Sequence, residues 1–216
     1  MWIQALKNHE VKVDINESTL EEAQKLVPCE YWEFLNVFSK LKSKHMLLRK
    51  PWDHRIDLKE DFPPKKGRLI PLSVNEQKEV EVFLDDQLLK GYICPSNSQQ
   101  TSPVFFVPKK DGKKHMVQDY CYLNEWTIKN NYPLLLILQL VNKLKGCKLF
   151  MKMDLWWGYN NVRIHEGDEW KAVFVTHKGA FEPLVMYFGL CNSPATFQKM
   201  MNEIFHDMSD VCMVYI

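Results

Sequence analysis

The residues of this sequence that could act on a phosphate are one carboxylate and a group of lysines. Residues 148–154 alternate as a half-buried strand does, which would place Asp154 at its C-terminal end, with Tyr159 five residues later. Four lysines lie upstream, within residues 109–114. Mg²⁺ prefers oxygen ligands and is often held by carboxylates together with substrate phosphates, on which lysines act as point charges. The pattern suggests phosphate and metal binding. A turn role for the Asp and simple solvation of the lysines remain open alternatives.

Length and composition restrict the class of protein. The chain has 216 residues, enough for one domain or a small pair, with 46% hydrophobic and 25% charged residues, as in globular proteins. Its net charge of +1 excludes a strongly basic nucleic-acid binder, so local patches must steer any polyanion. Six dispersed cysteines form no C-x-x-C pair, so we expect reduced, intracellular thiols rather than a zinc module. No apolar run approaches the ~20 residues of a membrane span, so we expect no membrane partner.

Several elements can be predicted from local signals. Ser73 and Glu76 form a capping-box pattern that opens a helix over residues 73–90, with Val80, Phe83, Leu84 and Leu88 on one side and Gly91 after it. Strands are expected at residues 103–108, 115–120, 171–176 and 181–186. The first two are joined by the turn Asp111-Gly112 and the last two by residues 177–180. Further helices are expected near residues 18–28 and 133–145, and from Ser193 as N-cap with Pro194 at the first helical position.

Two segments carry apolar stripes, and one carries neither stripe nor strand signal. Tyr31, Phe34, Leu35 and Phe38 recur at helical spacing, and the helix after Ser193 has a stripe made of Phe197, Met200, Met201, Ile204, Phe205 and Met208. Residues 40–71 are rich in Lys, Arg and Pro without periodicity, which predicts a linker or extended arm. Its basic residues are more typical of a solvated face than of a phosphate contact.

From about residue 71 onward, the sequence resembles the fingers and first palm segment of reverse transcriptases from gypsy-type LTR retrotransposons, especially fungal ones. The resemblance rests on ordered motifs: SPVFFVPKKDG at 102–112, DY at 119–120 with LN at 123–124, TIKNNYPL at 127–134, KMDL at 152–155, GYNNVRI at 158–164, GDEWK at 167–171, and FGL at 188–190 leading to NSPATFQ at 192–198. It implies an α+β fold, with right-hand polymerase fingers and an incomplete palm whose antiparallel sheet is backed by helices. We therefore expect an N-terminal connector or arm at residues 1–70 and a reverse transcriptase domain at residues 71–216.

The resemblance also implies roles for individual residues. Asp154 matches the first catalytic aspartate and would ligate Mg²⁺ together with the main-chain carbonyl of Leu155. Lys109 or Lys110 matches the lysine that grips the triphosphate of the incoming nucleotide, and His115 stands where an arginine contacts it. Tyr159 matches the aromatic gate against a 2′-OH, Phe188 an aromatic beside the nucleotide, and Gly189 a point of backbone approach to the primer–template. The implied activity is two-metal addition of dNTPs to a primer 3′-OH.

Departures from the family pattern point to reduced or lost activity. The sequence reaches Tyr215-Ile216, the lead-in to the adjacent Asp pair that completes the metal site, so we expect residues 1–216 alone to be inactive. Arginines usual in the subfamily are replaced by Cys94, His115, Cys121 and Trp156, and a proline by Leu136. The alternatives are therefore a non-catalytic nucleic-acid-binding remnant or the product of a decayed element.

The resemblance further implies where the protein would act and with what. Expected partners are an RNA or DNA template with its primer, dNTPs, and the remaining polymerase, RNase H and integrase parts of a polyprotein. The expected location is intracellular, in a cytoplasmic virus-like particle or the nucleus.

Overall fold

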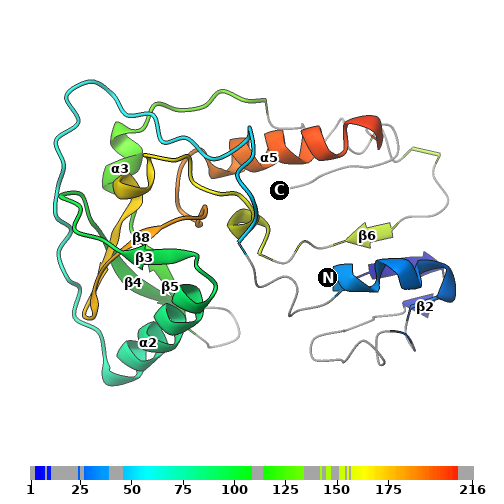
Figure 1. Cartoon of the computed structure of the whole chain (residues 1–216), viewed down its shortest axis with the longest axis horizontal. Helices are drawn as coiled ribbons and strands as arrows, with labels where there is room; N and C mark the ends of the chain where they lie inside the picture. The colour runs from blue at the N-terminus through cyan, green and yellow to red at the C-terminus, as the bar shows by residue number, and fades with distance from the viewer. Residues whose placement is uncertain are drawn as a thin grey trace. The chain divides into compact units, whose positions relative to one another are not determined.

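The computed structural model describes residues 3–7, 9–10, 24, 27–38, 46–108, 114–133, 142, 145–146, 151–153, 155 and 157–208. The chain divides into two compact units, Met1–His45 with Leu136–Gly158 and Met46–Leu135 with Tyr159–Ile216 (Figure 1). Within the described residues, no helix is both long and apolar enough to cross a bilayer.

The second unit is built on a five-stranded sheet with the order β3-β8-β7-β4-β5. Its strands are β3 (Ile93–Pro95), β4 (Ser102–Pro108), β5 (Lys114–Gln118), β7 (Phe174–Thr176) and β8 (Gly179–Pro183). β4 and β5 pair antiparallel, from Val104 opposite Gln118 to Pro108 opposite Lys114, which confirms the first predicted hairpin. The predicted turn Asp111-Gly112 lies outside the described residues.

The second predicted hairpin is also confirmed, with shorter strands than expected and a shorter turn. β8 begins at Gly179 rather than at residue 181, so the turn spans residues 177–178 rather than 177–180. β7 and β8 pair antiparallel, from Phe174 opposite Phe181 to Thr176 opposite Gly179. The prediction that a strand begins at residue 171 was wrong, because the chain there forms the 3-10 helix η3 (Glu169–Ala172), in which Lys171 N donates to Asp168 O at 3.1 Å. β4 and β7 run parallel, with Ser102 opposite Phe174, so the sheet is mixed rather than purely antiparallel. The predicted α+β class is confirmed.

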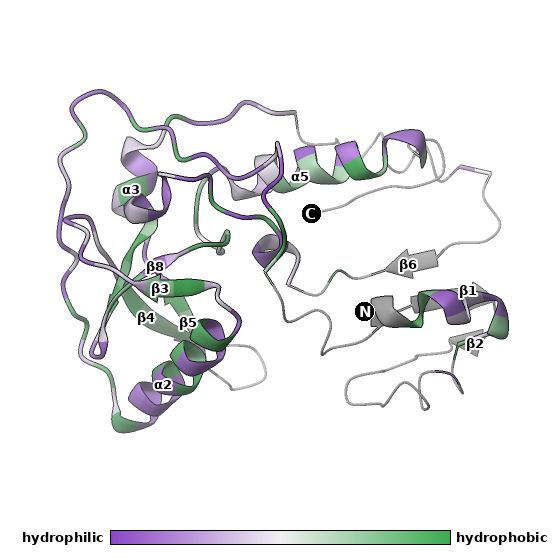
Figure 2. Ribbon diagram, in the orientation of Figure 1, coloured by the Kyte–Doolittle hydropathy of each residue, from purple (hydrophilic) through white to green (hydrophobic). Residues whose placement is uncertain are grey.

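The helix α2 (Val74–Leu89) forms where the capping pattern predicted it. The Ser73 hydroxyl accepts from Glu76 N, and the Glu76 carboxylate accepts from Ser73 N at 2.8 Å. Val80 and Leu84 are buried in one hydrophobic cluster with residues of the sheet, and Figure 2 shows hydrophilic and hydrophobic bands alternating along α2. The placement of Leu88 on the buried side was wrong. Leu88 is exposed, and Gln87 is buried instead, where its Oε1 accepts from the Tyr187 hydroxyl at 2.6 Å.

Helices α3 (Cys121–Trp126) and α5 (Ser193–Ile204) complete the described α-helices of the second unit. The predicted cap of α5 was wrong by one residue: Asn192 is the N-cap, and the Ser193 hydroxyl donates to Tyr187 O at 3.3 Å. The stripe of α5 is buried only in part, because Ile204 and Met208 are exposed.

Residues 46–70 are extended, as predicted, and they pack on the second unit. His54 N donates to Arg163 O at 2.7 Å, and His165 N donates to His54 O at 2.8 Å. His54 and Ile56 are buried, and Arg49 pairs with Glu169 at 2.8 Å. These contacts make residues 46–70 part of the folded unit, while a domain boundary at residue 70 stays a prediction.

The first unit contains an antiparallel sheet of order β2-β1-β6, made of β1 (Ile3–Lys7), β2 (His9–Glu10) and β6 (Met151–Met153). β6 confirms residues 151–153 of the strand predicted at residues 148–154, whose other residues lie outside the described part of the chain. The 3-10 helix η1 (Cys29–Phe38) stands where an apolar α-helical face was predicted. The predicted apolar face was wrong. Tyr31 and Phe34 are exposed, and Leu35 is the only buried residue among the η1 side chains that the structure describes. With three residues per turn, Tyr31 and Phe34 lie together on a side of the helix that does not include Leu35. The helices predicted at 18–28 and 133–145 fall largely outside the described residues.

The cap of α2 can be tested by removing the Ser73 hydroxyl. We expect Ser73→Ala to lower the free energy of unfolding by about 1 kcal/mol, since the Glu76 N–H loses its acceptor. Urea denaturation would measure the change. Ser73→Thr, which keeps a hydroxyl at the same place, serves as the matched control and should stay close to the parent chain.

His54 makes the stability of the second unit depend on pH. Burial lowers the pKa of His54 to about 4, and its Nδ1 lies 2.9 Å from the Thr196 hydroxyl. The unfolded chain, with a His pKa near 6.5, binds a proton between pH 6.5 and 4 that the folded chain does not. The free energy of unfolding should therefore fall by about 2 kcal/mol between pH 7.5 and pH 5.

The measurement is urea denaturation at the two pH values, with His54→Gln and the exposed His206→Gln compared. The decrease should be smaller in His54→Gln and unchanged in His206→Gln. An equal decrease in all three chains would contradict the assignment to His54.

Candidate nucleotide and primer–template site

An aromatic pair of one partly buried and one exposed ring is the most distinct feature near the predicted nucleotide site. Tyr159, in the 3-10 helix η2 (Gly158–Asn161), and Phe188 have ring centroids 4.4 Å apart, and Phe188 is 66% exposed. The buried ring of Phe197 contacts Tyr159 edge-on from α5, at 5.3 Å. Burial raises the pKa of the Tyr159 hydroxyl, which therefore stays neutral at physiological pH. A supported ring with one exposed neighbour can contact a sugar or a base.

Phe188 belongs to a turn that leads into α5. Gly189 has φ +99°, a conformation that favours glycine. The Asn124 side chain bridges the turn: Nδ2 donates to Gly189 O at 2.7 Å, and Oδ1 accepts from Cys191 N at 2.8 Å. The sequence predictions did not single out Asn124, although it is part of the LN motif at residues 123–124. The signal that could have identified it is a polar residue directly after the buried Leu123.

The lysine-rich hairpin is described at its base and not at its tip. Lys109, Lys110 and Lys113 lie outside the described residues. Lys114 pairs with Glu76 of α2 at 2.6 Å, and this contact is the largest of the causes that lower the pKa of Glu76 to about 2. His115 is exposed and stands opposite Val107 in the hairpin. At least one of the four predicted phosphate-facing lysines is thus engaged by a carboxylate.

Of the two predicted metal ligands, the structure describes only Leu155. Asp154 lies outside the described residues, and Leu155, in the first unit, is exposed. Across the described ranges, no three His, Cys, Asp or Glu residues are grouped so that they could hold a metal ion. The described cysteines Cys29, Cys94, Cys121 and Cys191 are free thiols.

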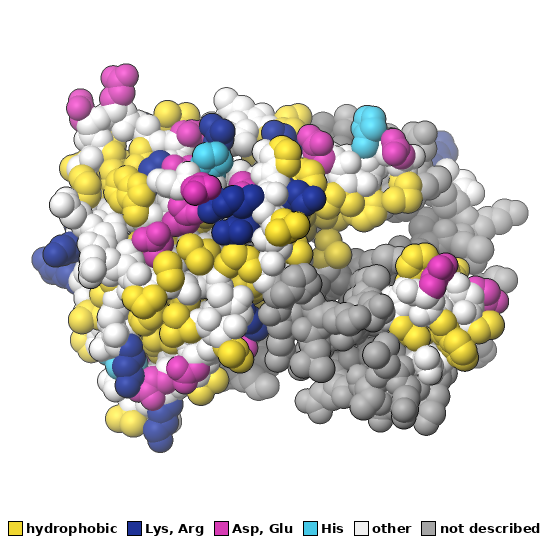
Figure 3. All heavy atoms as spheres, in the orientation of Figure 1, with side chains coloured by type: hydrophobic (Ala, Val, Ile, Leu, Met, Phe, Trp, Pro, Cys, Tyr) yellow, Lys and Arg dark blue, Asp and Glu magenta, His cyan; other side chains and the backbone are white. Residues whose placement is uncertain are grey.

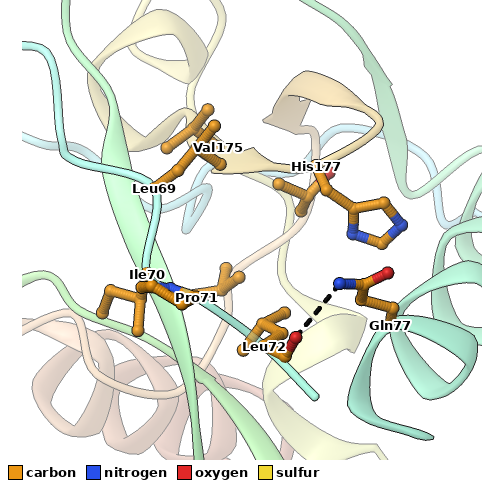
Figure 4. Close-up of a pocket in the computed structure, with 9 residues that line it drawn as sticks. Leu69, Ile70, Pro71, Leu72, Gln77, Val175 and His177 are labelled. Atoms are coloured by element: carbon orange, nitrogen blue, oxygen red, sulfur yellow. Dashed lines mark hydrogen bonds between the residues drawn. The ribbon is translucent and has the colours of Figure 1, made fainter. Parts of the chain in front are cut away.

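A small pocket of about 230 Å³ lies elsewhere in the second unit. Figure 4 shows Leu69, Pro71 and Val175 among its lining, with Gln77 and His177 as polar members. Gln77 Nε2 donates to Leu72 O at 3.0 Å, so this amide already has a partner. None of the residues predicted for the nucleotide site lines this pocket.

Charge on the surface is mixed. On the face drawn in Figure 3, Lys and Arg side chains are interspersed with Asp and Glu rather than gathered into one basic field. Ion pairs account for part of this pattern, including Arg49 with Glu169, Lys171 with Asp168 and Lys178 with Glu81. Long-range attraction of a polyanion is therefore weak over this face.

Comparison with known proteins connects this geometry to a family. Residues 107–216 match the sequence pattern of the family described as reverse transcriptase (RNA-dependent DNA polymerase). The Tf2-3 transposon polyprotein of Schizosaccharomyces pombe is 32% identical over 210 residues, covering 92% of this chain and 16% of the polyprotein. The Tf2-7 polyprotein of the same organism is 31% identical over 216 residues, with 95% and 16% covered. The chain thus spans about a sixth of the length of these relatives.

Solved structures agree on the fold. The foamy viral protease–reverse transcriptase in complex with an RNA/DNA hybrid superposes with a TM-score of 0.69 at 17% identity, covering 95% of this chain and 30% of that one. The native protease–reverse transcriptase of prototype foamy virus gives a TM-score of 0.66 at 21% identity, with 96% and 30% covered. Together with the match of residues 107–216 and the relatives above 30% identity, this shows that the chain belongs to the reverse transcriptase family and is a segment of the kind found in gypsy-type retrotransposon polyproteins.

Proposed function

We propose that this chain forms the fingers and the first part of the palm of an RNA-directed DNA polymerase that adds dNTPs to a primer 3′-OH. The observation that carries the proposal is the contact between Tyr159 and Phe188, which joins two residues 29 positions apart into one supported, exposed aromatic face. Such a face suits a nucleoside, whose sugar and base both offer apolar surface.

Each residue of the candidate site has a proposed task. Tyr159 packs beneath the incoming sugar and excludes a 2′-OH, while the ring of Phe188 contacts the same nucleotide. Lys109 or Lys110 holds the triphosphate, and His115 contributes a weaker contact there, because an imidazole lacks the bidentate fork of a guanidinium. Gly189 allows the backbone to approach the primer–template.

Mg²⁺ is the proposed cofactor, with Asp154 and the Leu155 carbonyl as part of its ligand set. Both are hard oxygen donors of the kind that Mg²⁺ prefers. Bound there, the metal would lower the charge on the reacting phosphate. Holding two such ions takes more carboxylates than Asp154 alone, so we expect a polypeptide of residues 1–216 by itself not to extend a primer.

The proposed partners follow from the relatives. The foamy viral enzyme was solved with an RNA/DNA hybrid and also with double-stranded DNA, so we propose a primed RNA or DNA template as ligand. The Tf2 relatives are polyproteins, so we propose further polymerase, RNase H and integrase parts as neighbours, and an intracellular site of action in a virus-like particle or the nucleus. Division into an arm at 1–70 and a polymerase domain at 71–216 is part of the same proposal.

A non-catalytic nucleic-acid-binding remnant is the second candidate function. It depends on the lysine hairpin, and the pairing of Lys114 with Glu76 reduces the charge that this hairpin offers. Mg²⁺-dependent extension separates the two candidates, since a remnant would bind a primer–template and not extend it.

Primer extension tests the polymerase proposal. A recombinant chain continued past residue 216 through the rest of the reverse transcriptase domain should extend a primed template with Mg²⁺, and Asp154→Asn should abolish extension. Tyr159→Val should lose roughly 10- to 200-fold in discrimination between dNTPs and rNTPs, the range over which a pocket excludes a small group. Phe106→Val, a change of similar size in a partly buried ring of β4, is the control and should leave discrimination unchanged. Discrimination equal in the parent and Tyr159→Val chains would reject the gate.

The close packing at Gly189 can be tested through stability. A Cβ at this position would lie 3.3 Å from Tyr120 Cδ2 and 3.4 Å from Gln118 O, at φ +99°. We expect Gly189→Ala to destabilise the fold by about 1–3 kcal/mol. Gly167→Ala is the matched control, with φ +89° and nothing within 4 Å of the added carbon, so the difference in unfolding free energy isolates the close contact. Equal losses in the two variants would show that contact to be unimportant.

A further inference from the structure

Two asparagine side chains hold the turn at residues 188–192 from opposite directions. Asn124, on α3, reaches toward the turn and contacts Gly189 O and Cys191 N, at 2.7 and 2.8 Å. Asn192, the N-cap of α5, reaches the other way: its Nδ2 donates to Ile128 O at 2.8 Å, and its Oδ1 accepts from Asn130 N at 2.9 Å. We call this pair, Asn124 and Asn192, the asparagine clasp.

Both side chains use the donor and the acceptor of the amide. An aspartate in either place would keep the acceptor and lose the donor, and a serine has no second atom placed to bridge two backbone groups. Asn192 is buried, where an unmade hydrogen bond is costly. The four bonds all run to main-chain groups, so they fix backbone position rather than side-chain rotamers.

The clasp acts on the backbone segment next to the exposed ring of Phe188. Gly189 O is one of its four partners, and Gly189 directly follows Phe188. The preceding residue, Tyr187, is anchored through its hydroxyl to Gln87. Phe188 thus lies between two anchored points, while 66% of its own surface is free for contact.

We propose that Asn124 and Asn192 are positioning residues that set the backbone of the Phe188–Gly189 turn for primer–template and nucleotide. The proposal rests on the function proposed above and adds that the donor bond from Asn124 to Gly189 O is the decisive contact. Because both bonds of the Asn124 side chain run to main-chain atoms of the turn, Asn124 acts through Gly189 in this proposal.

The test compares three substitutions in the full 216-residue chain. Asn124→Ala removes both bonds, and Asn124→Asp keeps an acceptor for Cys191 N but removes the donor to Gly189 O. Asn202→Ala is the matched control, because Asn202 also uses both ends of its amide, with Gln198 and Tyr132, away from the turn. Hydrogen exchange of the Cys191 amide, thermal unfolding, and fluorescence anisotropy with a labelled RNA/DNA primer–template are measured for each.

We expect exchange at Cys191 to be roughly five- to tenfold faster in Asn124→Ala and near the parent rate in Asn124→Asp, in proportion to one lost hydrogen bond. Primer–template affinity should fall about three- to tenfold in both Asn124 variants and not in Asn202→Ala. A loss of affinity in Asn124→Asp with Cys191 still protected would not arise from general destabilisation.

Three outcomes would overturn the proposal. Unchanged exchange in Asn124→Ala would show that Asn124 does not hold the turn. Faster exchange with parental affinity would show that the turn's position does not matter for binding. No binding by the parent chain, with the exchange effect present, would reject the proposed function and the binding role together while leaving the clasp as a feature of the fold.

Discussion

The parallel pairing of β4 with β7 is the interaction on which the second unit depends. It joins two antiparallel hairpins that are far apart in the sequence, with Ser102 opposite Phe174 and Ser102 N donating to Val173 O at 2.7 Å. A parallel pair cannot be closed by a tight turn, so a long connection separates the two strands in the sequence. His115 extends from one hairpin, and the turn with Phe188 follows the other. This pairing places the two hairpins side by side in one sheet.

Hydrogen bonds between buried polar groups connect parts of the second unit that are distant in the sequence. Gln87 of α2 bonds the Tyr187 hydroxyl, the Tyr120 hydroxyl donates to Ala172 O at 3.0 Å, and His54 of the extended arm meets Thr196 of α5. Each link connects a helix or the arm to a segment distant in sequence. Because a buried polar group without a partner is costly, these contacts favour one arrangement over others that would bury the same apolar area.

Sequence signals predicted the elements that depend on residues close together in the chain. The capping box of Ser73 and Glu76 and the alternation in both hairpins predicted α2 and the strands because each involves residues a few positions apart. The burial of Gln87 in place of Leu88, the 3-10 helix in place of an apolar face at Tyr31 and Phe34, and the shift of the α5 cap to Asn192 depend on tertiary neighbours. The contact of Tyr159 with Phe188 was not predicted: the family resemblance assigned each ring separately to the nucleotide, and no periodicity connects η2 with the turn at Phe188.

The hairpin shows why a count of lysines in the sequence overstates the positive charge available to a nucleic acid. Lys114 is one of four lysines counted from the sequence, yet its ammonium already pairs with Glu76, whose carboxylate also serves the N-terminus of α2. A lysine so compensated releases fewer counterions when a phosphate replaces its partner, and it must first give up a contact that helps hold the hairpin to α2. With a net charge of +1, the primer–template binding proposed for this chain would depend less on long-range attraction than on short-range fit. In that proposal, the fit comes from the backbone turn at Phe188–Gly189 and the aromatic pair beside it.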